Sequence, residues 1–432
     1  MKPRVSHPFS PIIGTGRLVA LTFAVIAPAS SVFLTYGTAF QAAGPGIVLG
    51  FAAASLVNLA VMLCYAELGS RYPQAGGDYG LAAGSLGHWG ASLYTVLLGV
   101  KGIAIPALLA LTTADYLHQL LAVVPMEATA SLVFLLFIVL GSRNIRTSSA
   151  VVVVMVAIEF FVFALFLVLA LTHLRHPWGI LWHPGVAPST WLGAVAPALY
   201  GLNGPQACLY YSEEAKTSKR HIGRTILGAA LATISVEMAA VVVATLALPH
   251  LRTSAHSLPL ATIVATSLGP WGRLCIVGAI TVALFDTGLA TTMSYARIFY
   301  AIARDGRWPP PLNRWMNYIS ARGVPIGALL ALAACNLVTL ACSQVHTLVT
   351  LGGTLLIVIY AGIVAGTVLT HFKSVAPYAM PLWPWPPVIA ALGIALTAAS
   401  LDGYHLVLTG LVVLLGLSWA CIAPHAPTSR QI

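Results

Sequence analysis

The sequence predicts an all-α polytopic membrane protein with twelve transmembrane helices. Three observations predict this fold class: 59% of the 432 residues are hydrophobic, only 7% are charged, and the apolar residues form long runs separated by short polar gaps. A soluble domain carries about 25% charged residues, and a soluble chain of this length could not bury so much apolar surface. Intrinsic disorder is also excluded, because it requires low hydrophobicity and high charge.

Twelve apolar runs approach or exceed the length of about 20 residues that a helix needs to cross a bilayer. In chain order the expected spans are Leu18–Phe40, Ile47–Leu68, Trp89–Leu111, Met126–Leu140, Ala150–Leu171, Trp191–Tyr211, Ile226–Leu248, Leu274–Ile302, Val324–Ala341, Leu348–Leu369, Val388–Ser400 and Tyr404–Ala423. The fourth and eleventh runs are among the shortest. His256–Gly269 is only weakly apolar and is expected to form an interfacial helix.

The basic residues predict the orientation of the chain. With twelve spans, seventeen of the 21 Lys and Arg residues fall on the side of the two termini, three on the other side (Arg175, Arg252 and Arg273), and Lys101 within the membrane. The cytoplasmic loops of membrane proteins carry an excess of Lys and Arg, so both termini are expected in the cytoplasm. The expected location is the inner or plasma membrane. The net charge of +10 then needs no nucleic-acid partner, because no basic stripe lies on a soluble face.

Nothing in the sequence indicates a cofactor. The six cysteines have no paired spacing, so neither a disulfide framework nor a metal site is predicted. The sequence contains neither an H-E-x-x-H nor a G-x-S-x-G motif, so a membrane-embedded enzyme is an alternative without a recognisable catalytic motif. The oligomeric state is left open.

Two of the apolar runs are interrupted near their middles. The first contains Ala27-Pro28-Ala29-Ser30-Ser31, and the sixth contains Gly201-Leu202-Asn203-Gly204-Pro205. Proline removes a backbone donor and glycine relaxes a helix, so each stretch is a plausible break, with an ordinary proline kink as the alternative. Interrupted spans at corresponding positions of two halves indicate a transporter site between inverted repeats, here the first five spans and the next five.

Three segments around these runs resemble, in the same order, those of the amino acid–polyamine–organocation (APC) permeases. They are CYAELGSRYPQAGGDY at 64–79, YGLNGPQ at 200–206 with SEEAK at 212–216 and RTIL at 224–227, and YARIFYAIARDG at 295–306. The resemblance covers about residues 17 to 370 and does not specify a substrate. It implies secondary active transport of amino acids or related amines by alternating access, with proton symport or exchange. Exchange of polyamines or other organic amines is the alternative.

The resemblance also implies ten helices in a 5+5 inverted repeat, with discontinuous helices 1 and 6, plus two peripheral helices. The chain then divides into a cytoplasmic N-terminal segment (1–16), the first repeat (17–173), the second repeat (190–370), the peripheral helices (378–423) and a cytoplasmic tail (424–432). The expected partners are a small amino acid or amine, protons and the lipid bilayer.

The interrupted helices are the expected substrate site. A broken helix exposes N–H groups that attract a carboxylate and C=O groups that attract a cation. The predicted substrate-binding residues are Ala29, Ser30, Ser31, Tyr200, Asn203, Gly204 and Gln206. The first three stand where the resembled family has a Gly-Ser-Gly run, and Gln206 stands where Glu is frequent. The two serine hydroxyls could bind an anionic group or, alternatively, their own helix backbone.

Four ionisable residues stand near the middles of predicted spans: Lys101, Glu159, Glu237 and Asp286. A charge at mid-membrane costs several kcal/mol, so each is a candidate for function. Glu159, midway along the fifth span, is the first candidate for proton coupling, and Asp286 the second. Lys101 is expected to pair with one of the three carboxylates in a structural role.

Charged residues also stand at the predicted cytoplasmic ends of the helices. Glu67, Arg71, Glu213 and Arg297 are expected to form an inner gate, with Asp78, Glu214 and Arg304 nearby. The alternative is a set of solvated charges that contribute little.

Overall fold

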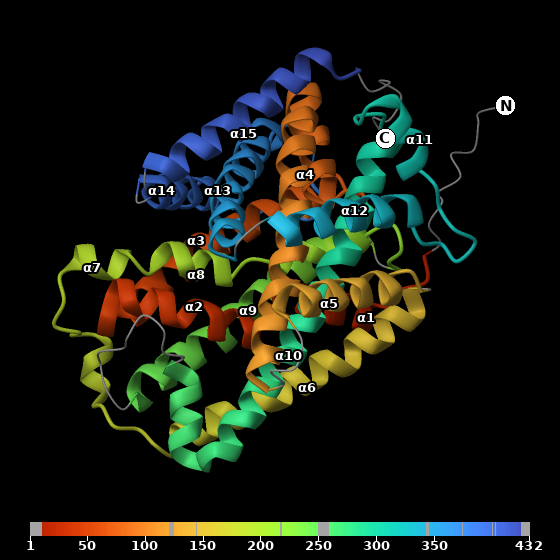
Figure 1. Cartoon of the computed structure of the whole chain (residues 1–432). Helices are drawn as coiled ribbons and strands as arrows, with labels where there is room; N and C mark the ends of the chain where they lie inside the picture. The colour runs from red at the N-terminus through yellow and green to blue at the C-terminus, as the bar shows by residue number, and fades with distance from the viewer. Residues whose placement is uncertain are drawn as a thin grey trace.

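The computed structural model describes residues 11–120, 125–143, 145–216, 218–248, 259–342, 345–373, 375–399, 401 and 403–424 (Figure 1). Most of the predicted cytoplasmic segment 1–16 and tail 424–432 lie outside these residues, as does Arg252. The described part is helical and contains no β-strand, apart from one isolated bridge between Ile13 and Ala215.

The helices follow the apolar runs of the sequence. Their bounds are α1 Thr15–Ile26, α2 Pro28–Ala43, α3 Ile47–Arg71, α4 Asp78–Leu120, α5 Met126–Gly141, α6 Ile145–Leu171, α7 Pro188–Leu192, α8 Val195–Gly201, α9 Lys219–Ala247, α10 Pro259–Arg304, α11 Pro310–Met316, α12 Ile326–Cys342, α13 Val345–Thr370, α14 Trp385–Ala399 and α15 Gly403–Ile422, with 3-10 turns η1 Gly44–Gly46, η2 Trp178–Leu181 and η3 Pro205–Tyr211. Within the described ranges, seven helical segments are long and apolar enough to cross a membrane. The chain is therefore a multi-pass membrane protein.

The first predicted span consists of two helices that are separated by a single residue. Helix α1 ends at Ile26, Ala27 adopts the left-handed conformation (φ 44°, ψ 70°), and α2 begins at Pro28. Proline disfavours the α conformation in the residue before it and favours the first position of a new helix. The interruption is shorter than the predicted stretch 27–31, because Ala29, Ser30 and Ser31 already belong to α2.

The sixth predicted span is also discontinuous. Helix α8 ends at Gly201, and the chain continues as the 3-10 helix η3 from Pro205. Gly204 between them has φ 130°, a conformation open to glycine. A Cβ at Gly204 would lie 2.9 Å from Cγ1 and 3.0 Å from Cα of Ile26. The two interruptions therefore touch each other.

Two helices begin earlier than their apolar runs and bend at a glycine. Helix α4 bends at Gly87 (φ 66°, ψ −143°), and α10 bends at Gly269 (φ 64°, ψ −154°). The described part of the predicted interfacial helix His256–Gly269 is the first segment of α10, up to this bend.

Helix α4 runs through the middle of the helical array in Figure 1, where it packs against α5, α10, α13 and α15. Helix α3 packs against α9 and also contacts α8. Helices α14 and α15 lie at one edge of the array in Figure 1, against α3, α4 and α13. This packing leaves the two interruptions in the interior, where α1, α2, α8, η3 and α10 meet.

The contact of α3 with the end of α7 and with Ala194, just before α8, requires glycine. A Cβ at Gly50 would lie 2.6 Å from the carbonyl oxygen of Trp191 and 2.6 Å from the Cβ of Ala194. We expect Gly50→Ala to lower the free energy of unfolding by about 1–3 kcal/mol, because backbone must move to admit the methyl group. Thermal melting of the purified protein in detergent measures this change. Gly228→Ala is the control, since a Cβ at Gly228 in α9 meets nothing within 4 Å, and equal melting temperatures would contradict the packing argument.

Candidate functional site

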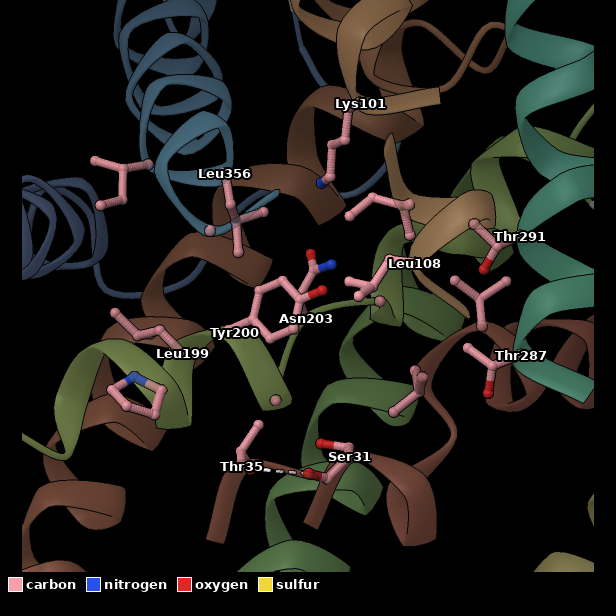
Figure 2. A pocket seen from close by; sticks show the side chains of 18 of the residues that line it. Ser31, Thr35, Lys101, Leu108, Leu199, Tyr200, Asn203, Thr287, Thr291 and Leu356 are labelled. Atoms are coloured by element: carbon pink, nitrogen blue, oxygen red, sulfur yellow. Dashed lines mark hydrogen bonds between the residues drawn. The ribbon is translucent and has the colours of Figure 1, made fainter. Parts of the chain in front are cut away.

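A cavity of about 530 Å³ lies at the two interruptions, between α1, α2, α4, α8, η3, α10 and α13. Its wall combines aliphatic and aromatic side chains with hydroxyl and amide groups (Figure 2). The predicted site residues that line it are Ser30, Ser31, Lys101, Tyr200, Asn203, Gly204 and Gln206. Ala29 and the three intramembrane carboxylates are not among the lining residues. The structure thus gathers most of the predicted binding set around one space.

Two carboxylates cap the start of α2. The backbone N–H of Ala29 donates to Oε1 of Glu159 at 2.9 Å, and the hydroxyl of Ser31 donates to Oε1 of Glu237 at 2.9 Å. Both carboxylates are buried, and they come from α6 and α9. The other oxygen of each has no hydrogen-bond partner among the residues that the structure describes. The protein's own carboxylates therefore accept hydrogen bonds from the Ala29 N–H and the Ser31 hydroxyl, which were expected to bind a substrate.

Ser30 bonds to its own backbone, as the alternative interpretation states. Its hydroxyl donates to the carbonyl oxygen of Ala27 at 3.1 Å and lies 3.5 Å from Oγ1 of Thr287 in α10. Its side chain also borders the cavity. The polar edge of the cavity therefore extends from α2 to α10.

Asp286 lies behind this edge, on α10. It is fully buried, and neither of its oxygens has a hydrogen-bond partner in the described ranges. It interacts electrostatically with Glu159, which interacts in turn with Glu237. Lys101 forms no ion pair with any of these three carboxylates in the described part of the chain. Its electrostatic partner is Asp78, so the structure does not bring Lys101 to the partners expected for it.

Asn203 is held in a fixed orientation by two neighbours. Its Oδ1 accepts one hydrogen bond from Nε2 of Gln206 and one from the hydroxyl of Tyr360, each at 3.0 Å. Its amide nitrogen has no hydrogen-bond partner among the residues that the structure describes and can donate to a molecule in the cavity. Sequence reasoning missed Tyr360, because it lies in the tenth predicted span outside the quoted motifs.

The charges predicted to form one inner gate lie in three clusters. Glu67 accepts from Arg71 at 2.9 Å and from the backbone of Met380 at 3.1 Å, and it contacts Nδ1 of His371 at 2.9 Å. In the second cluster, Glu213 pairs with Arg304 at 2.9 Å. Glu214 and Arg297 form the third. His371 has no motif around it in the sequence, and only the fold brings it to Glu67.

The Glu214–Arg297 pair is buried, with both side chains 4% exposed. Nε of Arg297 donates to Oε1 of Glu214, and the guanidinium carbon lies 4.6 Å from the centre of the Tyr211 ring. Removal of one partner from a buried pair leaves an uncompensated charge. This pair ties the segment after η3 to α10.

We expect Arg297→Met to lower the free energy of unfolding by about 3–5 kcal/mol, because Glu214 would stay buried without a partner. Arg314→Met removes the same charge from an exposed position of α11 and should change it by about 0.5 kcal/mol or less. Thermal melting of the purified variants separates the two cases. A melting temperature for Arg297→Met as high as that of Arg314→Met would show that the buried pair does not stabilise the fold.

The helices and the cavity define a multi-pass membrane protein with a central pocket. The sequence model of the amino acid permease family matches residues 13–415, and the chain belongs to this family.

The chain is also similar to individual transporters. It is 23% identical to the branched-chain amino acid permease BcaP of Lactococcus lactis, over 95% of this chain and 94% of the relative. It is 24% identical to the methylthioribose transporter of Bacillus subtilis, over 68% and 70%. It is 27% identical to the human large neutral amino acids transporter small subunit 2, over 76% and 62%. The chain is therefore a transporter for amino acids or related compounds and not an enzyme.

Proposed function

We propose that the chain is a secondary active transporter that carries amino acids across the inner or plasma membrane by alternating access. The observation that carries this proposal is the cavity of about 530 Å³ at the interruptions of two membrane helices. Secondary transporters bind substrates near the bilayer midplane between discontinuous helices of this kind. The relatives named for amino acid transport support the substrate class.

We propose twelve spans, with residues 17–173 and 190–370 as inverted repeats and 378–423 as two peripheral helices. Matched irregularities support the repeat. The interruption at Ala27 has its counterpart at Gly204, and helices α4 and α10 both bend at a glycine just before the third and eighth spans, at Gly87 and Gly269, with φ of 66° and 64°. Two unrelated halves would have no physical reason to share these features in the same order.

We propose that both described ends of the chain lie on the cytoplasmic side. The backbone N–H of Ile13 donates to the carbonyl oxygen of Glu214 at 2.9 Å, next to Arg297. Nη1 of Arg307, just after α10, donates to the carbonyl oxygen of Pro424 at 3.1 Å. Both ends of the described chain thus contact the basic side of the molecule, which the distribution of Lys and Arg assigns to the cytoplasm.

The end of α1 is the proposed site for the substrate's ammonium group. The last carbonyls of a helix lack intrahelical partners and carry partial negative charge. Val25 and Ile26, the last two residues of α1, line the cavity. Carbonyl oxygens at this position would accept hydrogen bonds from an amino group.

Glu159 is the proposed site of proton coupling. It caps α2 through Oε1, its Oε2 has no hydrogen-bond partner in the described ranges, and no cationic side chain pairs with it there. An unpaired carboxyl group within a membrane protein is a candidate for binding and releasing a proton. Gain or loss of that proton changes the charge at the start of α2, immediately beside the cavity.

Counterflow tests the carrier mechanism. Proteoliposomes preloaded with an unlabelled amino acid should accumulate the labelled form transiently above its external concentration, because a carrier returns with bound substrate. Uptake of each of the twenty amino acids, with and without preloading, measures this effect. Flux that is unaffected by preloading and does not saturate would indicate a channel and contradict the proposal.

We expect Glu159→Gln to abolish the stimulation of uptake by an inward proton gradient while downhill exchange persists. The amide keeps an oxygen for the Ala29 N–H but cannot release a proton at this site. The measurement is uptake at an imposed pH gradient, compared with a matched symmetric buffer. Glu127→Gln, at an exposed position of α5, is the control and should keep the stimulation. Undiminished stimulation in Glu159→Gln would place coupling elsewhere.

A further inference from the structure

We propose that Lys101, and not the start of α2, binds the carboxylate of the substrate. This inference rests on the proposed function and specifies the substrate class: molecules that present a carboxylate to the cavity. Carboxylate-free amines, including polyamines, are excluded as good substrates.

The first observation concerns the charges that face the cavity. Among its lining residues Lys101 is the only Lys, Arg, His, Asp or Glu. Lys101 belongs to α4, only 6% of its surface is exposed, and it forms no ion pair within the described ranges. An unpaired ammonium group in a largely apolar wall is costly, and an anionic ligand would relieve that cost.

The second observation concerns the donors at the start of α2, the other place where a carboxylate could bind. Pro28 has no N–H, and the N–H of Ala29 is donated to Glu159. The N–H of Ser31 is donated to the carbonyl of Ala27, and its hydroxyl to Glu237. A substrate carboxylate at this point would also meet two buried carboxylates, so both hydrogen bonding and charge disfavour it.

The third observation is that neutral donors accompany Lys101 in the cavity. Gln206 and Tyr360 fix the orientation of the Asn203 amide through its Oδ1, and its amide nitrogen has no hydrogen-bond partner in the described ranges. Figure 2 shows the amine end of Lys101 directed into the space that also holds Tyr200 and Asn203. A carboxylate there could accept a charge-assisted hydrogen bond from the ammonium group and further bonds from neutral groups.

Asp78 does not replace the substrate in this role. Its Oδ2 accepts from the hydroxyl of Tyr210 at 3.0 Å, and it interacts with Lys101 only at longer range. It is buried and is not a lining residue. Lys101 lines the cavity and Asp78 does not, so an anionic ligand in the cavity can reach the ammonium group.

The remaining wall accommodates the rest of the molecule. Leu108, Leu199, Leu356 and Ile357 line the cavity and provide an apolar surface for a side chain. The end of α1 supplies carbonyl oxygens for the ammonium group, as proposed above. The substrate class that fits all three surfaces is an amino acid with its carboxylate at Lys101.

The test compares matched ligands on the purified full chain. Binding of L-leucine, L-leucinamide and 3-methylbutylamine is measured by thermal shift and by competition, after a screen of all twenty amino acids and putrescine. If another amino acid binds best, its own amide and decarboxylated amine replace the leucine set. We expect the wild-type protein to prefer the amino acid to its amide by at least tenfold and not to bind putrescine. Equal binding of the amino acid and its amide by the wild type would overturn the inference without any variant.

Variants of Lys101 assign the effect to one group. Lys101→Met should weaken amino acid binding at least tenfold and bring the ratio of amino acid to amide within twofold, whereas Lys101→Arg should preserve the preference. Lys373→Met removes the same charge from an exposed position and should preserve it too. If Lys101→Met still transports the amino acid and its ratio of amino acid to amide binding equals that of the wild type, this inference is wrong while the proposed function stands. A wild-type protein that binds no amino acid would overturn the proposed function as well.

Discussion

A helix that is interrupted inside a membrane must still satisfy its backbone, and Glu159 meets this constraint at the start of α2. No water is available in hydrocarbon, so each unsatisfied N–H costs several kcal/mol. Pro28 removes one donor, and Glu159 accepts from the next, at Ala29. The hydrogen bond joins residues that are 130 positions apart and thereby fixes α6 against α2. The cavity beside the interruption depends on this attachment.

The site separates its charges into two layers. The carboxylates of Glu159, Glu237 and Asp286 lie behind α2 and α10, out of the cavity, while Lys101 faces the cavity from α4. Glu159 and Glu237 hydrogen-bond to the start of the broken helix, and Lys101 is the group that we propose for the ligand.

The sequence predicts the architecture well where the pattern is local. The apolar runs correspond to helices such as α3, α6 and α9, and Pro28 and Gly204 mark the two interruptions. It fails where a contact joins distant segments. The pairing of Ser31 with Glu237 and of Glu67 with His371 spans 206 and 304 positions, and no periodicity records such pairs.

The beginning of α4 escaped prediction for a different reason, and the beginning of α10 was expected only as a separate interfacial helix, 256–269. Their first segments are less apolar than a membrane span, and a glycine with positive φ separates each of them from the long apolar segment that follows. Hydropathy alone finds only the second part. The predicted binding residues were chosen because they flank the helix breaks. A ligand was the partner expected for Ala29 and Ser31, but the fold supplies Glu159 and Glu237 instead.

The near-contact of Gly204 with Ile26 gives the two interruptions a one-way mechanical relation. The space between Gly204, just before η3, and Ile26, at the end of α1, would not admit even a methyl group, so the two segments have little room to approach each other further. Steric repulsion opposes a closer approach of Gly204 to Ile26, but it does not oppose their separation. A rearrangement that alters this distance is therefore easier when it draws the two segments apart than when it presses them together, and both segments line the cavity.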